Sequence, residues 1–409
     1  MAKNRRDSKG RSLQKGETYN SGRKLYCFNY RDPLGHRRYI YSKSLIKLRE
    51  KEREIRRDSL DGIDSYARSN CTLDFLFARY IGVKQNLRNS TRTNYIYTYR
   101  RYIKDTLGKR KIGDIKYSEL LYFYQKQLDR GLSLNTVDSM HRVVSAALKL
   151  AVRDDIIRKN PADGVMAELK ASNKKSEARH PLSYKQEKAF LNCLDQPENK
   201  RWKPIFYFMF GTGCRVGEVI GIRWEDIDFE AGEISINHDT VYCPREDDDF
   251  RCGFEINMPK TDAGIRTIPL LDKVRDVLLE EKDYLDKNGL YRSLVVDGMT
   301  DFVFYNRFGT LHKPSALNKI IKRIVDDHNE QETVKAAEED REPLLIPYFS
   351  CHIIRHTFCT RLCENETNIK LIQQIMGHVD IRTTMDIYAE VTKEKAHSVF
   401  KELNNGDVL

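Results

Sequence analysis

The spacing of apolar residues changes along the chain, and the first change marks a small N-terminal unit. Two short, aromatic-rich stretches at 24–30 and 37–41 flank a turn sequence at 32–35, and this order predicts a β-hairpin. Residues 44–60 carry many charges and a few apolar residues at helical spacing, so we expect one helix packed on the small sheet. Those apolar residues are Leu45, Leu48 and Ile55.

From residue 72 to about 170 the apolar period becomes helical, and four helices fit the span. The segments that carry this period are 73–80, 95–103, 120–128 and 137–152. The polar, lysine-bearing stretch that follows, up to Pro181, predicts a linker between domains.

After the linker the pattern mixes helices with short strands. Ser183 and Gln186 have the spacing of a capping box that opens a helix. Strands are expected at 233–237, 265–270 and 302–305. Two acidic insertions are expected near 245–250 and 325–343.

The chain is therefore predicted to be an α+β multidomain protein. It would consist of a small β-sheet plus helix, an all-α domain, and a mostly α-helical domain with a small antiparallel sheet. The expected boundaries are 1–65, 72–170, a linker at 171–181, and 182–409.

Composition narrows the class of protein. The 409 residues suit two or three domains, and no apolar run approaches the ~20 residues that a membrane span needs. The nine cysteines are odd in number and contain no Cys-x-x-Cys, which argues against a disulfide framework and a structural zinc site. We expect a cytoplasmic, nucleoid-associated protein with free thiols and no membrane partner.

The net charge of +11 is unevenly distributed. Residues 1–60 alone carry +11 and residues 61–170 carry +8, whereas residues 171–409 carry −8. A basic front end of this kind favours a polyanion partner, most often nucleic acid, although a solvated charged face is the alternative for any single stretch.

Several basic residues are candidates for DNA contacts. A small sheet with arginines at its turn can enter a major groove, or it can be a basic cap on a larger domain. Residues 92–102 interleave arginines with tyrosines, and these tyrosines either serve phosphate contacts or belong to the core. The candidates are Arg37, Arg38, Arg92, Arg100, Arg101, Lys174 and Lys175.

The last domain carries basic residues in short motifs that lie far apart in sequence. Gly211-Thr-Gly-Cys-Arg215-Val-Gly-Glu218 places an arginine at a glycine-rich helix entry, where backbone N–H groups also favour anions. In His352-Ile-Ile-Arg355-His356 the i, i+3 and i+4 spacing places three basic side chains on one helical face. Each motif alone is weak evidence for a site.

Three further residues complete the set. Lys260 precedes a turn between two strands, Gly377-His378 follows a helical run, and Tyr388 comes ten residues after His378. The sequence contains no glycine-rich phosphate loop and no His-Glu-x-x-His, so nucleotide hydrolysis and a metal site are not expected.

In this order and spacing, the motifs resemble those of the tyrosine recombinases. The resemblance covers the whole chain, because integrases of conjugative transposons also place a small arm-type DNA-binding domain and a helical core-binding domain before the catalytic one. By this resemblance Tyr388 is the nucleophile, and the activating residues are Arg215, Lys260, His352, Arg355 and His378. Two positions depart from the family pattern: Ile354 stands where leucine is usual, and Glu390 where a histidine often follows the tyrosine.

The resemblance implies a site-specific recombinase that excises and integrates a mobile element, without cofactor, metal or ATP, through a 3′-phosphotyrosine intermediate. Forked arginines neutralise the phosphate, and a lysine protonates the leaving 5′ oxygen. His352 either accepts the tyrosine proton or orients the phosphate. The implied partners are double-stranded DNA with arm-type and core-type sites, three further copies in a homo-tetramer, and an excisionase or DNA-bending protein.

Two alternatives stay open: a chromosome-dimer resolvase of the same chemistry, and a non-catalytic DNA-binding protein. The C-terminal tail is also open. Thr392 is a plausible N-cap, and a short apolar stripe follows at Ala396, Val399, Phe400 and Leu403. We expect this tail helix to dock on a neighbouring protomer, with folding back on its own domain as the alternative.

Overall fold

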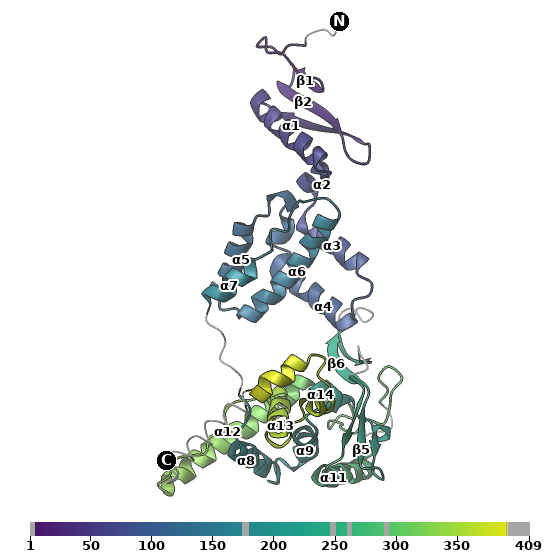
Figure 1. Cartoon of the computed structure of the whole chain (residues 1–409), viewed down its shortest axis with the longest axis vertical. Helices are drawn as coiled ribbons and strands as arrows, with labels where there is room; N and C mark the ends of the chain where they lie inside the picture. The colour runs from purple at the N-terminus through teal and green to yellow at the C-terminus, as the bar shows by residue number, and fades with distance from the viewer. Residues whose placement is uncertain are drawn as a thin grey trace. The chain divides into compact units, whose positions relative to one another are not determined.

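The computed structural model describes residues 5–173, 180–245, 251–259, 264–289, 294–389 and 391. The chain divides into two compact units, residues 1–176 and 177–409. Figure 1 traces both units along the chain, and each is described by itself.

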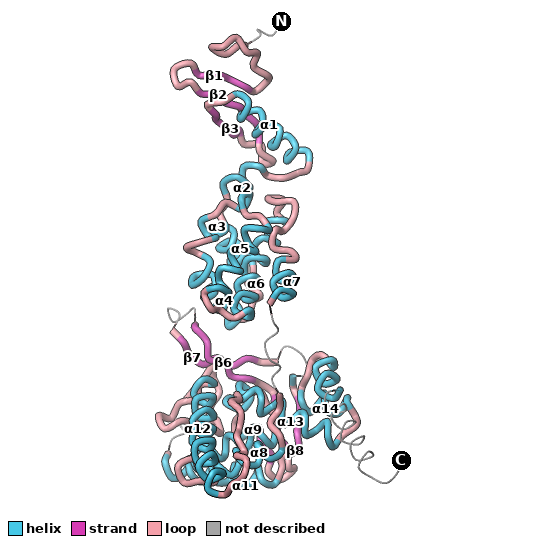
Figure 2. Tube along the Cα trace, turned by 90° about the vertical axis from the view of Figure 1, so that its left-hand side faces the viewer, coloured by secondary structure: helices cyan, strands magenta, loops and turns pink. Residues whose placement is uncertain are grey.

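The first unit begins with a three-stranded antiparallel sheet in the order β1-β2-β3 and one helix on its face (Figure 2). The elements are β1 (Glu17–Asn20), β2 (Leu25–Arg31), β3 (Arg37–Ser42) and α1 (Leu45–Leu60). Tyr26 and Phe28 of β2 pack with Leu45 and Leu48 of α1 in a small buried cluster. The predicted hairpin and helix are confirmed, and β1 is an additional strand.

The rest of the first unit is helical. Its elements are α2 (Ser65–Asn70), α3 (Leu73–Val83), α4 (Asn89–Thr98) with a π-helical turn (Tyr99–Ile103), 3₁₀ turns (Leu107–Lys109, Ile112–Asp114), α5 (Tyr117–Asp129), α6 (Leu134–Arg153) and α7 (Val165–Ser172). The four predicted helices correspond to α3, α4 with its turn, α5 and α6, while α2 and α7 are additional. Helix α6 turns an unbroken apolar face inward, which includes Val137, Met140, Val144 and Leu148.

Asp58 connects the end of α1 to the helical region. Its carboxylate is buried and accepts hydrogen bonds from Ser65 Oγ at 3.0 Å and from Arg68 Nη1 at 3.0 Å. Arg158 Nη2 lies 2.7 Å from the other carboxylate oxygen. Within this unit, a buried polar junction that includes Ser65 therefore links α1 to the helical region.

The second unit is mostly helical. Its helices are α8 (Tyr184–Leu194), α9 (Lys203–Thr212), α10 (Val216–Gly221), α11 (Asp272–Asn288), α12 (Pro314–Glu338), α13 (Cys351–Asn365), α14 (Ile369–Met376) and a helical segment over 381–389, with 3₁₀ turns at Lys200–Trp202 and Trp224–Asp226. Its strands are β4 (Ile227–Asp228), β5 (Glu233–Ile236) and β8 (Arg266–Pro269) in one antiparallel sheet, and β6 (Asp239–Pro244) with β7 (Cys252–Asn257) in a hairpin.

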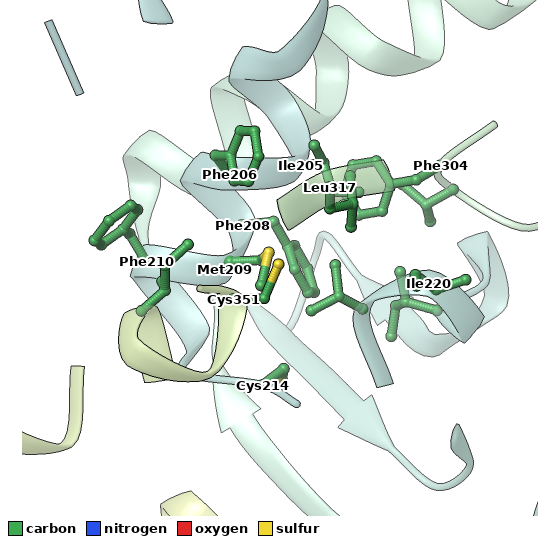
Figure 3. Packing of buried hydrophobic residues seen from close by; sticks show 14 of the residues in the cluster. Ile205, Phe206, Phe208, Met209, Phe210, Cys214, Ile220, Phe304, Leu317 and Cys351 are labelled. Carbon is green, nitrogen blue, oxygen red and sulfur yellow. The ribbon is translucent and has the colours of Figure 1, made fainter. Parts of the chain in front are cut away.

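Helix α9 is the centre of the second unit. It is buried along almost its whole length and contacts both α11 and α13 (Figure 1). Figure 3 shows Phe208 and Met209 of α9 beside Cys351, the first residue of α13. Because α13 is anchored on this core, the side chains that its first turn carries are held in fixed positions.

Three expectations about this unit can be compared with the structure. The capping box is confirmed: Ser183 N donates to Gln186 Oε1 at 3.0 Å, and Gln186 N donates to Ser183 Oγ at 3.3 Å. The strand expected at 302–305 is wrong, because these residues form only isolated bridges, Arg223 with Phe302 and Tyr305 with Leu311. The insertion expected at 325–343 is instead largely the C-terminal part of α12.

The mostly helical architecture with small antiparallel sheets confirms the predicted fold class. All nine cysteines lie in described residues and are free thiols. Within the described ranges, no helix is long and apolar enough to cross a membrane.

Candidate active site

Arg215 is positioned by a tight turn between α9 and α10. Gly213 ends α9 in the left-handed region at φ 61°, where a Cβ would lie 2.2 Å from Phe358, so only glycine fits. Arg215 then occupies the N-cap of α10, and its backbone N donates to Glu218 Oε2 at 2.8 Å. Its side chain also donates to Glu218, from Nη1 to Oε1 at 2.8 Å. The turn and Glu218 together fix the direction of the guanidinium.

Arg355 enters the same region from α13. It is 4% exposed, and Nη1 donates to the Gly213 carbonyl oxygen at 2.9 Å. Nη2 donates to the carbonyl oxygen of Met376. Arg355 therefore bridges the α9–α10 turn and the end of α14.

The end of α14 is the meeting point of three arginines from different elements. Its successive carbonyl oxygens accept hydrogen bonds from Arg266 Nε (Ile375, 2.8 Å), Arg355 Nη2 (Met376) and Arg215 Nη2 (Gly377, 3.0 Å). The last carbonyls of a helix lack intrahelical partners and form the negative end of its dipole, so they suit cations.

His378 follows directly after this cap. Its Nδ1 lies 2.9 Å from Thr384 Oγ1, and its backbone N donates to Gln373 O at 3.2 Å. Burial, followed by the charges of Arg355 and Arg215, lowers the pKa of His378 to about 4. The imidazole is therefore neutral at pH 7.

One carboxylate, Glu218, offsets part of the positive charge of the site. Burial alone would raise the pKa of Glu218, but the hydrogen bonds and charge of Arg266, with the charge of Arg215, lower it to about 2. Burial, followed by repulsion from Arg215, lowers the pKa of Arg355 to about 10. Glu218 is thus anionic and Arg355 remains cationic at neutral pH.

A hollow of about 380 Å³ opens beside these groups. Arg215, His352 and Arg355 line it together with residues of β6, among them Thr240 and Tyr242. Convergent cationic donors around a hollow can neutralise a phosphate and the charge that develops on it during displacement.

Tyr388 lies on the helical segment over 381–389. Its side chain is partly buried and packs against an apolar cluster that includes Cys359, Met376 and Ile387. The tyrosine is therefore carried by the same small subdomain as the α14 cap that holds the arginines.

The structure brings together four of the predicted site residues: Arg215, His352, Arg355 and His378. Lys260 lies outside the described residues. Glu218 and Arg266 were not predicted as site residues. A signal for Arg266 existed, because it stands two residues before the apolar Ile268 on β8 and so shares the inward-facing side of the strand.

Among the described DNA-binding candidates, some are exposed and others are hydrogen-bonded to the protein. Arg37 is exposed on β3, whereas Arg38 donates to Asp32 at 2.8 Å and stacks over the Tyr66 ring. Arg92 donates to Ile81 O at 2.8 Å, and Arg100 and Arg101 are exposed. Lys174 and Lys175 lie outside the described residues.

Comparison with known proteins shows the family of the chain. Residues 181–395, more than half of the chain, match the phage integrase family. The chain belongs to this family. As a tyrosine recombinase, it is an enzyme that cuts and rejoins DNA. Residues 1–59 of this integrase match the DNA-binding domain of Tn916 integrase.

Relatives extend over nearly the full length of the integrase. It is 30% identical to the transposase from transposon Tn916 of Enterococcus faecalis, over 99% of this chain and 98% of the relative. The transposase from transposon Tn1545 of Streptococcus pneumoniae matches with the same identity and coverage.

Solved structures agree with the fold of the integrase. The Tn1549 transposon integrase in complex with transposon right end DNA superposes with a TM-score of 0.67 at 28% identity, over 81% of this chain and 99% of that chain. A complex of the same protein with a circular intermediate DNA gives a TM-score of 0.68 at 26% identity, over 80% and 99%.

Proposed function

We propose that this integrase excises and integrates a conjugative transposon by recombining the element's ends with target DNA. Arg215 at the start of α10 and His352 and Arg355 of α13 line one hollow next to His378, and this observation carries the proposal. The DNA that the Tn1549 integrase binds, a transposon end and a circular intermediate, supports the same substrates here.

The proposed reaction begins with attack of the Tyr388 hydroxyl on a DNA phosphodiester. A 3′-phosphotyrosine forms, the 5′ oxygen leaves, and the bond energy is kept for attack by a second strand's 5′ hydroxyl. Arg215 and Arg355 grip the non-bridging oxygens through forked donors that cannot lose their charge at neutral pH.

The remaining groups move protons or orient the phosphate. His378 is neutral, so it can donate one hydrogen bond without adding another charge beside Arg355. Lys260 is the proposed general acid for the leaving 5′ oxygen, and His352 accepts the tyrosine proton or orients the phosphate.

The proposed arm-type DNA contact is the outer face of the β1–β3 sheet. Arg37, Tyr39 and Tyr41 alternate along β3, and all three are exposed, while the opposite face packs on α1. An exposed, basic and aromatic strand suits the width of a major groove. Arg38 faces away from this surface and is held by Asp32.

Core-type DNA would be contacted by the helical region of the first unit. Arg100 and Arg101 are exposed there, next to the exposed Tyr97. The same proposal covers assembly and partners. The integrase assembles as a homo-tetramer, and the tail that contains Phe400, which lies outside the described residues, docks in trans. The integrase associates with the nucleoid and has an excisionase or DNA-bending protein as a partner.

The experiment is covalent trapping on nicked DNA that carries the ends of the protein's own element. The proposal predicts a covalent protein–DNA adduct without metal or ATP, and footprints on both core and separate arm sites. A chromosome-dimer resolvase would form the adduct without using arm sites. A non-catalytic DNA-binding protein would form no adduct at all.

A further inference from the structure

Arg266 of β8 is buried next to the residues that are proposed to act in catalysis. Its side chain is only 5% exposed, and it contacts two separate elements. Nη1 and Nη2 donate to the two carboxylate oxygens of Glu218, at 3.1 and 2.8 Å, and Nε donates to Ile375 O at 2.8 Å. These donors point into the protein, so any effect of Arg266 on DNA passes through the groups that it holds.

Glu218, the first of these groups, also binds Arg215. Glu218 accepts hydrogen bonds from the backbone N and from Nη1 of Arg215, both at 2.8 Å. One carboxylate therefore joins a buried arginine to an arginine that lines the hollow. Without Arg266, Glu218 would keep its charge in a buried place with half of its donors missing, and its position would no longer be fixed.

The last turn of α14, the second group, binds both Arg355 and Arg215. Ile375, which Arg266 holds, is followed directly by the two carbonyls that accept from Arg355 and Arg215. Gly377 sits in the left-handed region at φ 62°, and a Cβ there would lie 2.9 Å from Arg266 Nη1. The last turn of α14 is therefore shaped around the Arg266 guanidinium.

We propose that Arg266 is a positioning residue for DNA cleavage, which holds Glu218 and the last turn of α14 so that Arg215 and Arg355 present their forks to the scissile phosphate. This inference rests on the proposed roles of those two arginines.

A purely stabilising role is the competing explanation. One argument against this explanation is that a buried ion pair is often no more stabilising than apolar residues of the same volume. A second argument comes from the hydrogen bonds. Among the described oxygen atoms, Arg266 donates to Glu218, which also binds Arg215, and to Ile375, whose next two carbonyls accept from Arg355 and Arg215.

The test is Arg266→Lys in the full chain, assayed by the rate of adduct formation on nicked DNA. Lysine keeps the charge but cannot form the fork and the Nε bond together, so we expect a loss of roughly 100-fold in rate. DNA affinity should stay at the wild-type level, because no DNA contact is removed.

The second arm repeats the assay on DNA in which a neutral methylphosphonate replaces the scissile phosphate. If Arg266 acts through the two arginines, the loss should shrink on this substrate, because there is less charge for their forks to neutralise. A defect that only lowers the folded fraction would reduce the rate on both substrates by the same factor.

Arg201→Lys is the matched control. Arg201 also forks onto a buried carboxylate, Glu281, at 2.5 and 2.9 Å, and donates to the Tyr305 carbonyl at 3.0 Å. Both variants should melt below the wild type. Only Arg266→Lys should slow cleavage at a temperature where both variants are folded.

Normal cleavage by folded Arg266→Lys, or equal losses on both substrates, would overturn the proposal. If Arg266→Lys does not fold, Glu218→Gln takes its place, with the same substrate-dependent loss expected and equal losses again overturning it. Failure of the proposed function is distinguishable, since the wild-type protein would then form no adduct.

Discussion

Arg215 donates from Nη2 to the carbonyl oxygen of Gly377 at 3.0 Å, across 162 positions of sequence. The bond joins a phosphate-binding candidate to the cap of α14, and the next residue, His378, is another candidate. Tyr388 packs against the same apolar cluster as Met376, the residue before that cap. A shift of the α14 cap would therefore disturb the arginine and the tyrosine together.

Arg215→Lys should block cleavage while leaving the protein folded. The lysine ammonium carries all its donors on one nitrogen, so it cannot reach Glu218 and Gly377 from two separate nitrogens, as Arg215 does, and still present a fork to a phosphate. We expect adduct formation to fall by about 100- to 1,000-fold. Adduct rates on nicked DNA and melting temperatures measure the two effects, and an active Arg215→Lys variant would contradict the role.

Gly377→Ala should both destabilise the protein and slow cleavage. Alanine in the left-handed region costs about 1–2 kcal/mol, and its Cβ would also displace Arg266. Gly289→Ala is the matched control, because Gly289 caps α11 at φ 63° with nothing within 4 Å of its Cβ. The control should lose similar stability in urea unfolding and keep its cleavage rate. Equal cleavage by the two variants would refute the link.

His378→Gln should change how stability depends on pH. Burial and the neighbouring arginines lower the pKa of His378 from its ordinary 6.5 to about 4, so the folded protein binds this proton less readily than the unfolded chain. Its contribution to the free energy of unfolding is complete above pH 6.5 and is lost as the pH falls toward 4. Urea unfolding at pH 7 and pH 5 should show a smaller loss for the variant than for the wild type. An equal loss would show that His378 is not held neutral.

Arg37→Ala should weaken arm-site binding and make it less dependent on salt. Removing a single phosphate-binding side chain from a duplex DNA interface reduces the slope of log affinity against log salt by ~0.9. Lys51→Ala is the control, because Lys51 is exposed on α1, outside the β1–β3 strands. Cleavage of core sites should be unchanged in both variants. Identical salt slopes for Arg37→Ala and the wild type would place the arm-binding surface elsewhere.

The sequence predicts those parts of the structure whose physics is local. Helix α6 repeats its apolar residues at helical spacing, and Ser183 with Gln186 caps α8 within four residues. Strand β1 could not be found in this way, because its inward residue is Glu17, whose charge is matched only by Arg49 of α1 at 2.8 Å among the described ion pairs. The run at 302–305 is buried at every position and has no period, so it does not distinguish a strand from an irregular core segment.

The same distinction applies to the site. Arg215, His352 and Arg355 stand in short motifs that indicate their chemistry, and the structure brings them together. Arg266 binds Glu218 and the end of α14 inside the protein. These partners become visible only when β8 and α14 are placed side by side. The Arg215–Glu218 contact spans only three residues, but the contacts of Arg266 with Glu218 and Ile375 join distant segments and leave no spacing in the sequence.

The most direct test of the whole account is whether the Tyr388→Phe variant forms a covalent adduct on nicked DNA. The change removes one hydroxyl and no phosphate-binding group, so the account predicts no adduct at nearly unchanged DNA affinity. Tyr242→Phe is the matched control, because Tyr242 is the tyrosine that lines the hollow, and this variant should still form the adduct. A normal adduct yield from Tyr388→Phe, or its loss in Tyr242→Phe alone, would contradict the account.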